Sequence, residues 1–559
     1  MSGSPMANVQ ALLKADWPHA LTLPERATLQ FNDEDNAARL LAVYGEDLVF
    51  VNGRGWAVWD GHRFSLRAGE LGAREIGHKL RAIVQEEAEW ARRDWEVQMD
   101  DVLRFMEACE RKRPPMIFRT PEDAVAEMRS EFAGRLYAHA TKCGNVAKVK
   151  SALEACQHQR RAEILDMDAD PHIFVVPNGQ INLRAVAAWE RPEACEEAEE
   201  LAARRSWLEP VDRTKLPTRV AGVPYDPKAD CPEWRAFMEL ILPHPEVRAC
   251  VQRITGAALR GCDAAQIAVL MRGASGGNGK STFQNALAMV FGDRDGYSAT
   301  CRVEMFLDLG NVMSNAANPD EVKLPGARVL LATEPKPTQI LDMTKIKGLT
   351  GCDVRQSRAL HMEGFDWRPN AIPFISCNKM PKIKDADGGS RRRLVIIPFE
   401  VELRKLPVEL RRKPSDVLAS LKAEASGILN WAIDGYRDFV ARGEEIDPPE
   451  AMEHIKATVF EGADPVRTFL DQMTVPDVNG RISVKAAYQV YEKWCDQEGR
   501  AFWNMKNFGD GMVEAGLERG PVKGRSHWKG IRWAEDAAEL VTIATGEDLP
   551  TRTPDGPPF

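Results

Sequence analysis

The sequence predicts a multidomain α/β protein, and three observations lead to this fold class. An apolar run at 267–271 precedes a glycine-rich turn, and apolar residues with helical spacing follow at 283–291, which is the strand–loop–helix order of an α/β core. Strand-type and helical runs share the N-terminal part. Helical segments followed by a basic and aromatic hairpin occupy 460–540, which suggests a winged helix.

The N-terminal part predicts a mixed α+β domain. Residues 45–65 hold strand-type runs separated by two Asn-Gly or Asp-Gly pairs, which predicts a small antiparallel meander. Trp56 and Trp59 within it are expected to lie in the core. Further predicted elements are charged helices over 70–165, a hairpin over 175–184, and a linker entering a helix over 223–242.

The composition is that of an ordinary globular chain. Its 559 residues are enough for about three to four domains, and 44% of them are hydrophobic. The chain has no apolar run of about 18 residues, no secretory signal and no C-x-x-C pair, so we expect a cytoplasmic protein with reduced thiols and no membrane contact. The net charge of −9 argues against a surface coated with positive charge for DNA, but it is compatible with a basic channel.

These patterns divide the chain into six predicted regions. They are a flexible arm (1–25), an N-terminal α+β domain (26–215), a linker and helical collar (216–262), a nucleotide-binding motor (263–440), a winged-helix-like domain (455–540) and a disordered tail (541–559).

The sequence ASGGNGKS at 274–281 is typical of a phosphate-binding loop. Ala274 stands where G-x-x-x-x-G-K-[ST] has its first glycine, and Gly273 lies one position earlier. Backbone N–H groups and the helix N-terminus can hold the phosphates of ATP. Lys280 is expected to reach the β and γ phosphates, and the Ser281 hydroxyl to ligate Mg²⁺. The candidate nucleotide-binding residues are Gly276, Gly277, Asn278, Gly279, Lys280, Ser281 and Thr282.

Two polar residues at the ends of later apolar runs complete a candidate catalytic set. Glu334 follows the run 329–332, where a carboxylate can orient or deprotonate the attacking water. Thr333 stands where an aspartate often holds the metal, so Ser281 is expected to be the main protein ligand of Mg²⁺. Asn378 ends another apolar run and can sense the γ phosphate, although an isolated Asn at a strand end is usually a cap or turn residue.

Three consecutive arginines, Arg391, Arg392 and Arg393, precede the apolar run 394–399. They are either a solvated charge cluster, a contact to DNA phosphate, or the source of an arginine finger for a neighbouring subunit, an element worth about 10³ to 10⁵ in rate. Arg393 directly abuts the strand, so it is favoured over Arg392 as the finger.

The order of these motifs resembles that of superfamily 3 helicases, and within them the phage and plasmid primase-helicase family that includes the poxvirus-type NTPase. The resemblance covers about residues 28–400 and, more loosely, 460–535. The segments that carry it are SGGNGKST, LPGARVLLATE, KIKGLTGCDVRQSRALHMEGFDWRP, FISCNKMP and DADGGSRRRLVIIPF in the motor, and FNDEDNAARLLAVYGEDLVFVNGRGWAVWDG, VPNGQINLR and YDPKADCPEW before it.

The resemblance implies an AAA+ motor that forms a homohexameric ring and serves the replication of a phage, prophage or plasmid. Where the family usually has a bulky aromatic residue before two arginines, this chain has Arg391. Many relatives carry an upstream primase-polymerase domain, for which we see no strand-borne D-x-D pair, so a separate primase or polymerase is the expected partner. The implied residue roles are Lys280 and Ser281 in the phosphate loop, Glu334 in the Walker B strand, Asn378 in sensor 1, and Lys347, Thr350, Asp353 and Arg358 leading into a DNA-lining hairpin that runs from His361 to Phe365.

A basic cluster near the C-terminal end is a second candidate DNA contact. Lys523, Arg525 and Lys529 lie close together in sequence around Trp528. Contact with DNA phosphates and a solvated hairpin are equally good explanations.

Three functions fit these observations. The first is a replicative DNA helicase on single-stranded or forked DNA, moving 3′ to 5′ as the family implies. The second is an ATP-driven translocase or loader that does not separate strands. The third is an origin-binding protein that uses ATP only to assemble, which the combination of Glu334, Asn378 and Arg393 argues against because assembly does not need a catalytic base.

Overall fold

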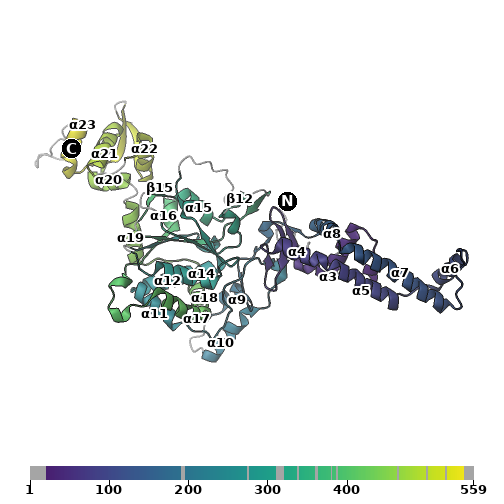
Figure 1. Ribbon diagram of the computed structural model, residues 1–559. Helices are drawn as coiled ribbons and strands as arrows, with labels where there is room; N and C mark the ends of the chain where they lie inside the picture. The colour runs from purple at the N-terminus through teal and green to yellow at the C-terminus, as the bar shows by residue number, and fades with distance from the viewer. Residues whose placement is uncertain are drawn as a thin grey trace, which may run out of the picture.

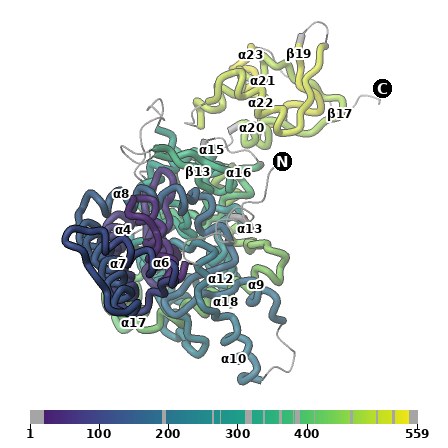
Figure 2. Tube along the Cα trace, turned by 90° about the vertical axis from the view of Figure 1, so that its right-hand side faces the viewer, coloured from purple at the N-terminus to yellow at the C-terminus, as the bar shows by residue number. Residues whose placement is uncertain are grey.

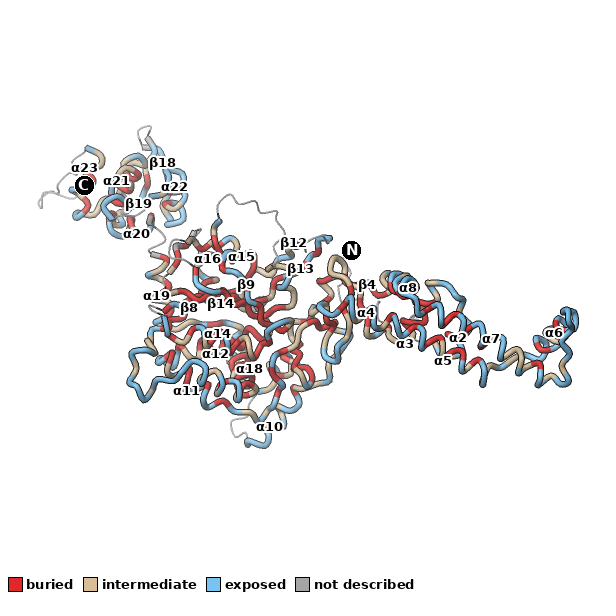
Figure 3. Tube along the Cα trace, in the orientation of Figure 1, coloured by how far each residue is buried: buried red, intermediate tan, exposed pale blue. Residues whose placement is uncertain are grey.

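The computed structural model describes residues 21–190, 196–273, 276–309, 320–335, 339–358, 363–378, 380–384, 388–461, 465–498, 502–522 and 525–546. A central body holds the largest sheet, a helical projection extends from it on one side, and a small C-terminal unit lies on the other (Figure 1). Figure 2 shows the C-terminal unit above the central body. Buried residues are concentrated in the central sheet and in the helices around it (Figure 3). Within these ranges, no helix combines the length and the apolar character needed to cross a bilayer.

Helices build the projection. α5 (Leu80–Arg93) and α7 (Pro121–Cys143) pack along each other, and α6 (Met99–Glu110) lies at the far end (Figure 1). α7 begins with a capping box in which Thr120 and Asp123 exchange side-chain to backbone hydrogen bonds. The other helices of this region are α2 (Leu23–Ala27), α3 (Asp33–Tyr44), α4 (Gly69–His78) and α8 (Val146–Gln159).

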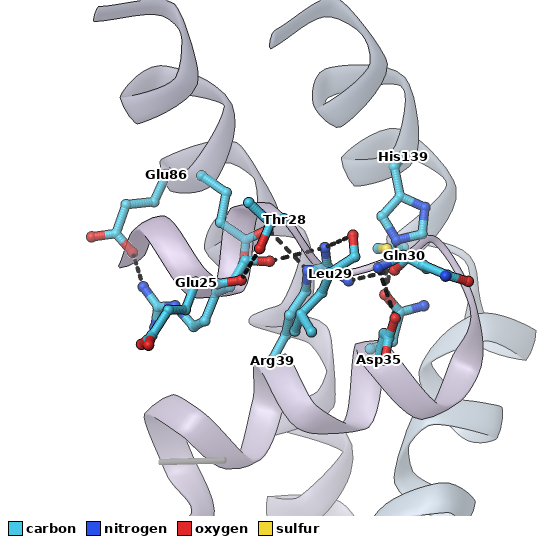
Figure 4. A network of polar contacts seen from close by, with 12 residues as sticks. Glu25, Thr28, Leu29, Gln30, Asp35, Arg39, Glu86 and His139 are labelled. Atoms are coloured by element: carbon cyan, nitrogen blue, oxygen red, sulfur yellow. Dashed lines mark hydrogen bonds and ion pairs between the residues drawn. The ribbon is translucent and has the colours of Figure 1, made fainter. Parts of the chain in front are cut away.

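A buried ion pair fixes α3 to α5. Arg39 Nε lies 2.9 Å from Glu87 Oε2, and neither side chain is exposed. Arg39 also donates to the backbone carbonyls of Arg26, Leu29 and Gln30, so one guanidinium holds the turn that precedes α3 (Figure 4). Burial raises the pKa of Glu87, and the charge of Arg39 opposes that effect.

We expect Arg39→Met to lower the free energy of unfolding by about 3 to 5 kcal/mol, because it leaves the Glu87 carboxylate buried without its partner. Urea denaturation of the full chain measures this. Lys150→Met is the matched control, since the Lys150–Glu154 pair has side chains 76% and 57% exposed and is worth at most about 1 kcal/mol. Equal effects of the two substitutions would contradict the prediction.

Two small sheets join the projection to the central body. β1 (Leu48–Val51), β2 (Gly55–Trp59) and β3 (Phe64–Ser65) are antiparallel neighbours, which confirms the predicted meander, and β4 (Arg161–Ala162) pairs in parallel with β1. Trp56 is buried as predicted, whereas Trp59 is half-buried. The second sheet contains the predicted hairpin and consists of β5 (Ile173–Val176), β6 (Gly179–Asn182) and β7 (Leu208–Glu209).

The central sheet has five strands, all paired in parallel, in the order β16-β8-β14-β10-β9. Alternate residues of β8 pack on opposite faces: Val269 and Met271 on one, Ala268 and Leu270 on the other. Both faces are buried, which explains why the strands are continuous apolar runs in the sequence. The strands are β8 (Ala268–Arg272), β9 (Ser298–Cys301), β10 (Val329–Ala332), β14 (Ile372–Cys377) and β16 (Leu394–Pro398).

Helices cover one face of this sheet, and mixed elements cover the other. The first face packs against α11 (Pro232–Ile241), α12 (Pro245–Arg260), α14 (Lys280–Phe291) and α18 (Ala425–Ala441). The second packs against α15 (Met343–Thr350), the β1–β3 sheet and the end of α19 (Glu450–Glu461). The remaining elements are α9 (Leu183–Ala188), α10 (Glu197–Ser206), α13 (Cys262–Ala265), β11 (Ile340–Asp342), β12 (Arg355–Arg358), β13 (Gly364–Trp367), β15 (Lys382–Lys384), α16 (Gly388–Arg393) and α17 (Pro414–Ala423).

The C-terminal unit has its own core. A three-stranded antiparallel sheet, in the order β17-β19-β18, includes one strand that lies between the first and second helices of the unit, so it is larger than the predicted two-stranded hairpin. Its last helix runs past residue 541, where we expected the tail to begin, because Leu540 and Val541 are buried in this core. The elements are α20 (Pro465–Met473), β17 (Thr474–Ser483), α21 (Val484–Gln497), α22 (Met505–Glu514), β18 (Glu518–Val522), β19 (Arg525–Trp533) and α23 (Ala538–Thr545).

Candidate nucleotide-binding site

Three neighbouring strands of the central sheet end at one edge. β8 lies between β14 and β16, and its last residue, Arg272, pairs with both Cys377 and Pro398. The Gly273 N–H donates to the Cys377 carbonyl at 3.0 Å. The segments that follow these strands therefore start side by side, at the edge where open parallel sheets bind ligands.

Glycines shape the loop that follows β8. Gly277 and Gly279 have φ angles of +90° and +87°, in the left-handed region that glycine adopts without strain. A Cβ on Gly279 would lie 2.6 Å from Ile241 Cγ2, and a Cβ on Gly273 would overlap Lys280 Nζ. The loop therefore needs glycine at these places and holds the first turn of α14 against α11. Ala274 and Ser275 lie outside the described residues.

Lys280 is the first residue of α14, and its ammonium group meets the end of β14. Lys280 Nζ donates to Asn378 Oδ1 at 2.7 Å, and Lys280 is 6% exposed. Burial lowers the pKa of Lys280, and the charge of Glu334 opposes this effect. The structure therefore brings Lys280 and Asn378 together, and the charge of Glu334 acts on Lys280. A nearly buried cation that donates to a neutral amide is suited to an anionic ligand.

The predicted metal ligand and water-orienting residue remain accessible at this edge. Ser281 is exposed and Thr282 half-buried on the first turn of α14, and Glu334 is exposed two residues after β10. Hydroxyl and carboxylate oxygens are ligands that Mg²⁺ accepts together with waters and nucleotide phosphates. These side chains fit the predicted ATP and Mg²⁺ chemically.

Gln284, which the sequence analysis missed, connects α14 to the two strands that carry the catalytic candidates. Its Nε2 donates to the carbonyls of Ala332 and Phe374 at 3.2 and 3.1 Å, and its Oε1 accepts from Ser376 Oγ at 3.1 Å. The available signal was one amide on an otherwise apolar helix face. These hydrogen bonds fix α14, which begins with Lys280, to the strands that Glu334 and Asn378 follow.

A segment after β16 closes another side of the loop and was also missed. The Leu403 N–H donates to the Gly277 carbonyl at 3.1 Å, and Asn278 Nδ2 donates to the Val401 carbonyl at 3.0 Å. Arg404 is exposed, and its Nε lies 3.3 Å from the place of a Cβ on Gly277. The structure thus adds a second cation beside the glycine-rich loop. In the sequence, Arg404 is indistinguishable from an ordinary solvated arginine.

The arginine triplet lies at the opposite edge of the sheet. It ends α16 directly before β16, whose five residues span about 16 Å at 3.3 Å per residue. Arg393 is half-buried and its Nη1 donates to Thr350 Oγ1 at 3.0 Å, whereas Arg392 is exposed. The Arg391 guanidinium lies 5.9 Å from the ring centroid of Phe460. Within one chain, the triplet therefore lies at the opposite end of the strands from the predicted phosphate loop, which follows β8.

Antiparallel strands β12 and β13 frame the predicted DNA-lining hairpin. Lys347 is half-buried in the last turn of α15, and Arg358 is exposed at the end of β12. His361 lies outside the described residues. The structure therefore places Lys347 and Arg358 on the elements that lead into the hairpin.

The C-terminal basic cluster is described only in part. Lys529 is exposed on β19, while Trp528 between the cations is 1% exposed and belongs to the core. Arg525 starts β19 and pairs through its backbone with Val522, whereas Lys523 lies outside the described residues.

Most of the helical projection, both small sheets and α11 lie within the part of the chain that matches a family model. Residues 37–243 match the family model D5 N terminal like. This D5-like region ends before the central sheet begins. Two viral relatives are similar: "Putative helicase L207/L206" of Acanthamoeba polyphaga mimivirus (29% identity over 163 residues) and "Putative helicase 022R" of Frog virus 3 (isolate Goorha; 25% over 283 residues).

These matches are partial. They cover 29% and 48% of this chain, but only 16% and 28% of the two relatives. A solved apo structure of the NrS-1 C-terminal region aligns with a TM-score of 0.34 at 11% identity, covering 55% of this chain and 78% of that one. Residues 37–243 are therefore similar to the D5 N-terminal region, and both partly matched relatives carry helicase names.

Proposed function

We propose that the chain is an ATP-dependent DNA helicase of superfamily 3, with an AAA+ core and a C-terminal winged helix. It acts as a homohexameric ring on single-stranded or forked DNA during replication of a phage, prophage or plasmid. One observation carries this proposal: where the central strands end, Lys280 donates a hydrogen bond to Asn378, and the charge of Glu334 acts on Lys280. The helicase names of the viral relatives support the choice of DNA unwinding as the work performed.

The side chains at this edge have distinct roles in the proposed reaction. The loop N–H groups and Lys280 hold the phosphates, and Lys280 regains the anionic partner that its burial favours. Glu334 orients the attacking water and accepts its proton, and Asn378 helps to position that water. The Ser281 hydroxyl would hold Mg²⁺, which would offset charge on the phosphates. Gln284 holds these groups in place relative to one another by fixing α14 to β10 and β14.

The arginines lie at the opposite side of the sheet from the phosphate loop, and this placement supports assembly of several copies of the chain. Arg392 and Arg393 lie at the amino ends of the strands, and the phosphate loop lies at the carboxyl ends. A second copy that presents its arginine edge to the loop completes a site that one chain leaves incomplete. A closed ring repeats this contact at every interface.

We expect Glu334→Gln to bind ATP with nearly unchanged affinity and to hydrolyse it about 10² to 10⁴ times more slowly, because the substitution removes the base and preserves the phosphate loop. Binding of a fluorescent ATP analogue and release of inorganic phosphate measure the two effects. Glu409→Gln, at an exposed position of the central body, is the matched control. Loss of ATP affinity in Glu334→Gln would show that the glutamate has a structural role instead.

Forked DNA tests the kind of work that hydrolysis drives. The proposal predicts ATP-dependent release of the displaced strand, which stops in Glu334→Gln. DNA-stimulated ATP hydrolysis with displacement of a bound protein but without strand release would support the translocase alternative and overturn the helicase assignment.

A further inference from the structure

A crevice of about 480 Å³ lies between the N-terminal meander and the edge of the central sheet. Its walls come from the end of β3, from the segment 322–325, and from β9, which is the last strand in the order of the described central sheet. This volume is within the range of small-ligand sites. None of its lining residues belongs to the nucleotide-binding site described above.

Positive charge predominates in this crevice. Arg67 and Lys323 line it with side chains that are each 66% exposed, and their nearest carboxylates lie at 3.9 and 4.0 Å, which makes these ion pairs loose. The full set of charged lining residues is Arg54, Arg67, Arg219, Arg294 and Lys323 against Asp293 and Asp295.

Two further guanidinium groups in the wall are held mainly by neutral acceptors. Arg219 donates to the backbone carbonyls of Gly296, Lys323 and Pro325, and Arg54 donates to the Val322 carbonyl at 2.8 Å. Carbonyl groups fix these side chains in place without cancelling their charge. Burial and the charge of Arg219 lower the pKa of Arg54 to about 10. Burial lowers the pKa of Arg219, and the charges of Asp168 and Asp295 offset part of this effect.

The crevice is connected to the hairpin framed by β12 and β13. The Arg54 guanidinium lies 5.0 Å from the ring centroid of Phe365 in β13. Beside the segment 322–325, Glu321 pairs with Arg355 at 3.1 Å and accepts a hydrogen bond from Ser357 at 2.8 Å, both in β12. A ligand in the crevice therefore lies one side chain away from β13.

We propose that this crevice binds phosphate groups and that the backbone of a single-stranded nucleic acid supplies them. Guanidinium groups match phosphate oxygens geometrically, and an exposed arginine and lysine at the opening add charge along the path of a strand. The assignment of the strand rests on the proposed function, because there the hairpin beside the crevice contacts single-stranded DNA. A free phosphate or pyrophosphate ion has the same chemistry. The experiment below distinguishes binding of such an ion from binding of a nucleic-acid strand.

The test compares two double variants that remove the same charge. Arg67→Ser with Lys323→Ser removes exposed cations from the crevice. Arg93→Ser with Lys150→Ser removes cations that are 72% and 76% exposed on the helical projection, with similarly loose acidic neighbours. Binding of a labelled single-stranded oligonucleotide is measured by fluorescence anisotropy at several salt concentrations, with a non-hydrolysable ATP analogue present. Thermal unfolding confirms that both variants fold.

The crevice variant should bind the oligonucleotide on the order of tenfold more weakly than the control, and its salt slope should fall by about 1.4, because each lost single-strand phosphate contact removes about 0.7. If pyrophosphate stabilises the control more than the crevice variant while oligonucleotide binding is equal, the ligand is a free phosphate species. Equal behaviour with both ligands overturns the proposal. ATP hydrolysis without DNA is measured in parallel: its absence from the wild-type chain contradicts the proposed function, whereas normal hydrolysis with equal binding contradicts only the crevice.

Discussion

Lys280→Ala is expected to abolish measurable ATP hydrolysis, with a loss of at least about 10² to 10³ in rate. The ammonium group is nearly buried beside Asn378, where the loop glycines hold it at the carboxyl edge of the sheet. Removing this charge deprives the phosphates of their main cationic contact from the loop, in a site where water screens charge poorly. Release of inorganic phosphate and binding of a fluorescent ATP analogue should both fail, in contrast to Glu334→Gln, which retains binding.

Lys422→Ala provides the control for this substitution. Lys422 is exposed on α17 in the same central body, so the variant loses an equal charge without touching the loop. It should hydrolyse ATP at the wild-type rate. Lys280→Ala should keep a cooperative thermal transition, because the lost side chain bonds to an amide that water can also satisfy. Retained turnover in Lys280→Ala would contradict the assignment of this loop as the ATP site.

Arg392→Ala is expected to bind ATP and to hydrolyse it about 10³ to 10⁵ times more slowly, because in the proposed ring its guanidinium acts on the nucleotide of a neighbouring subunit. Arg392 is exposed, at the edge of the sheet opposite to its own phosphate loop. Rings mixed from Arg392→Ala and Lys280→Ala chains should recover activity, since some interfaces then combine an intact arginine with an intact lysine. Phosphate release from verified mixed rings should exceed that of either variant alone.

Arg393→Ala separates the finger from a structural arginine. The sequence favoured Arg393, but its guanidinium donates to Thr350 at the end of α15. We therefore expect this substitution to cost about 1 kcal/mol of stability and to leave most of the hydrolysis rate. If Arg393→Ala, and not Arg392→Ala, loses activity and complements Lys280→Ala, Arg393 is the finger. Failure of both to complement would leave the triplet as a DNA-facing or structural cluster.

The elements that carry the candidate site were visible in the sequence because the central strands are buried on both faces. Continuous apolar runs predicted β8, β10, β14 and β16 to within one or two residues, and the polar residues just after them marked Glu334 and Asn378. The loop was recognisable because its glycines satisfy local backbone requirements. Such local requirements leave a direct trace in the order of amino acids.

Contacts between distant segments left no such trace. Gln284 reaches two strands that follow it by 48 and 90 residues, and Arg393 bonds to a helix 43 residues earlier. Arg404 and the crevice arginines depend on where the chain returns in space, and charge pattern alone classes them with solvated arginines. The boundary of the tail was misplaced for a similar reason, because α23 is held by the C-terminal core and has no strong sequence signal of its own.

The helical projection has a practical consequence for weighing the particle. A compact chain of 559 residues would have a radius of gyration of about 24 Å. α7 alone is roughly 35 Å long, and it extends outward from the central body (Figure 1). Such an outline increases hydrodynamic drag, so gel filtration will overestimate the mass of a single 62.3 kDa chain and of any ring that keeps its projections outward. Light scattering or mass photometry, which report mass independently of shape, are the suitable ways to count subunits.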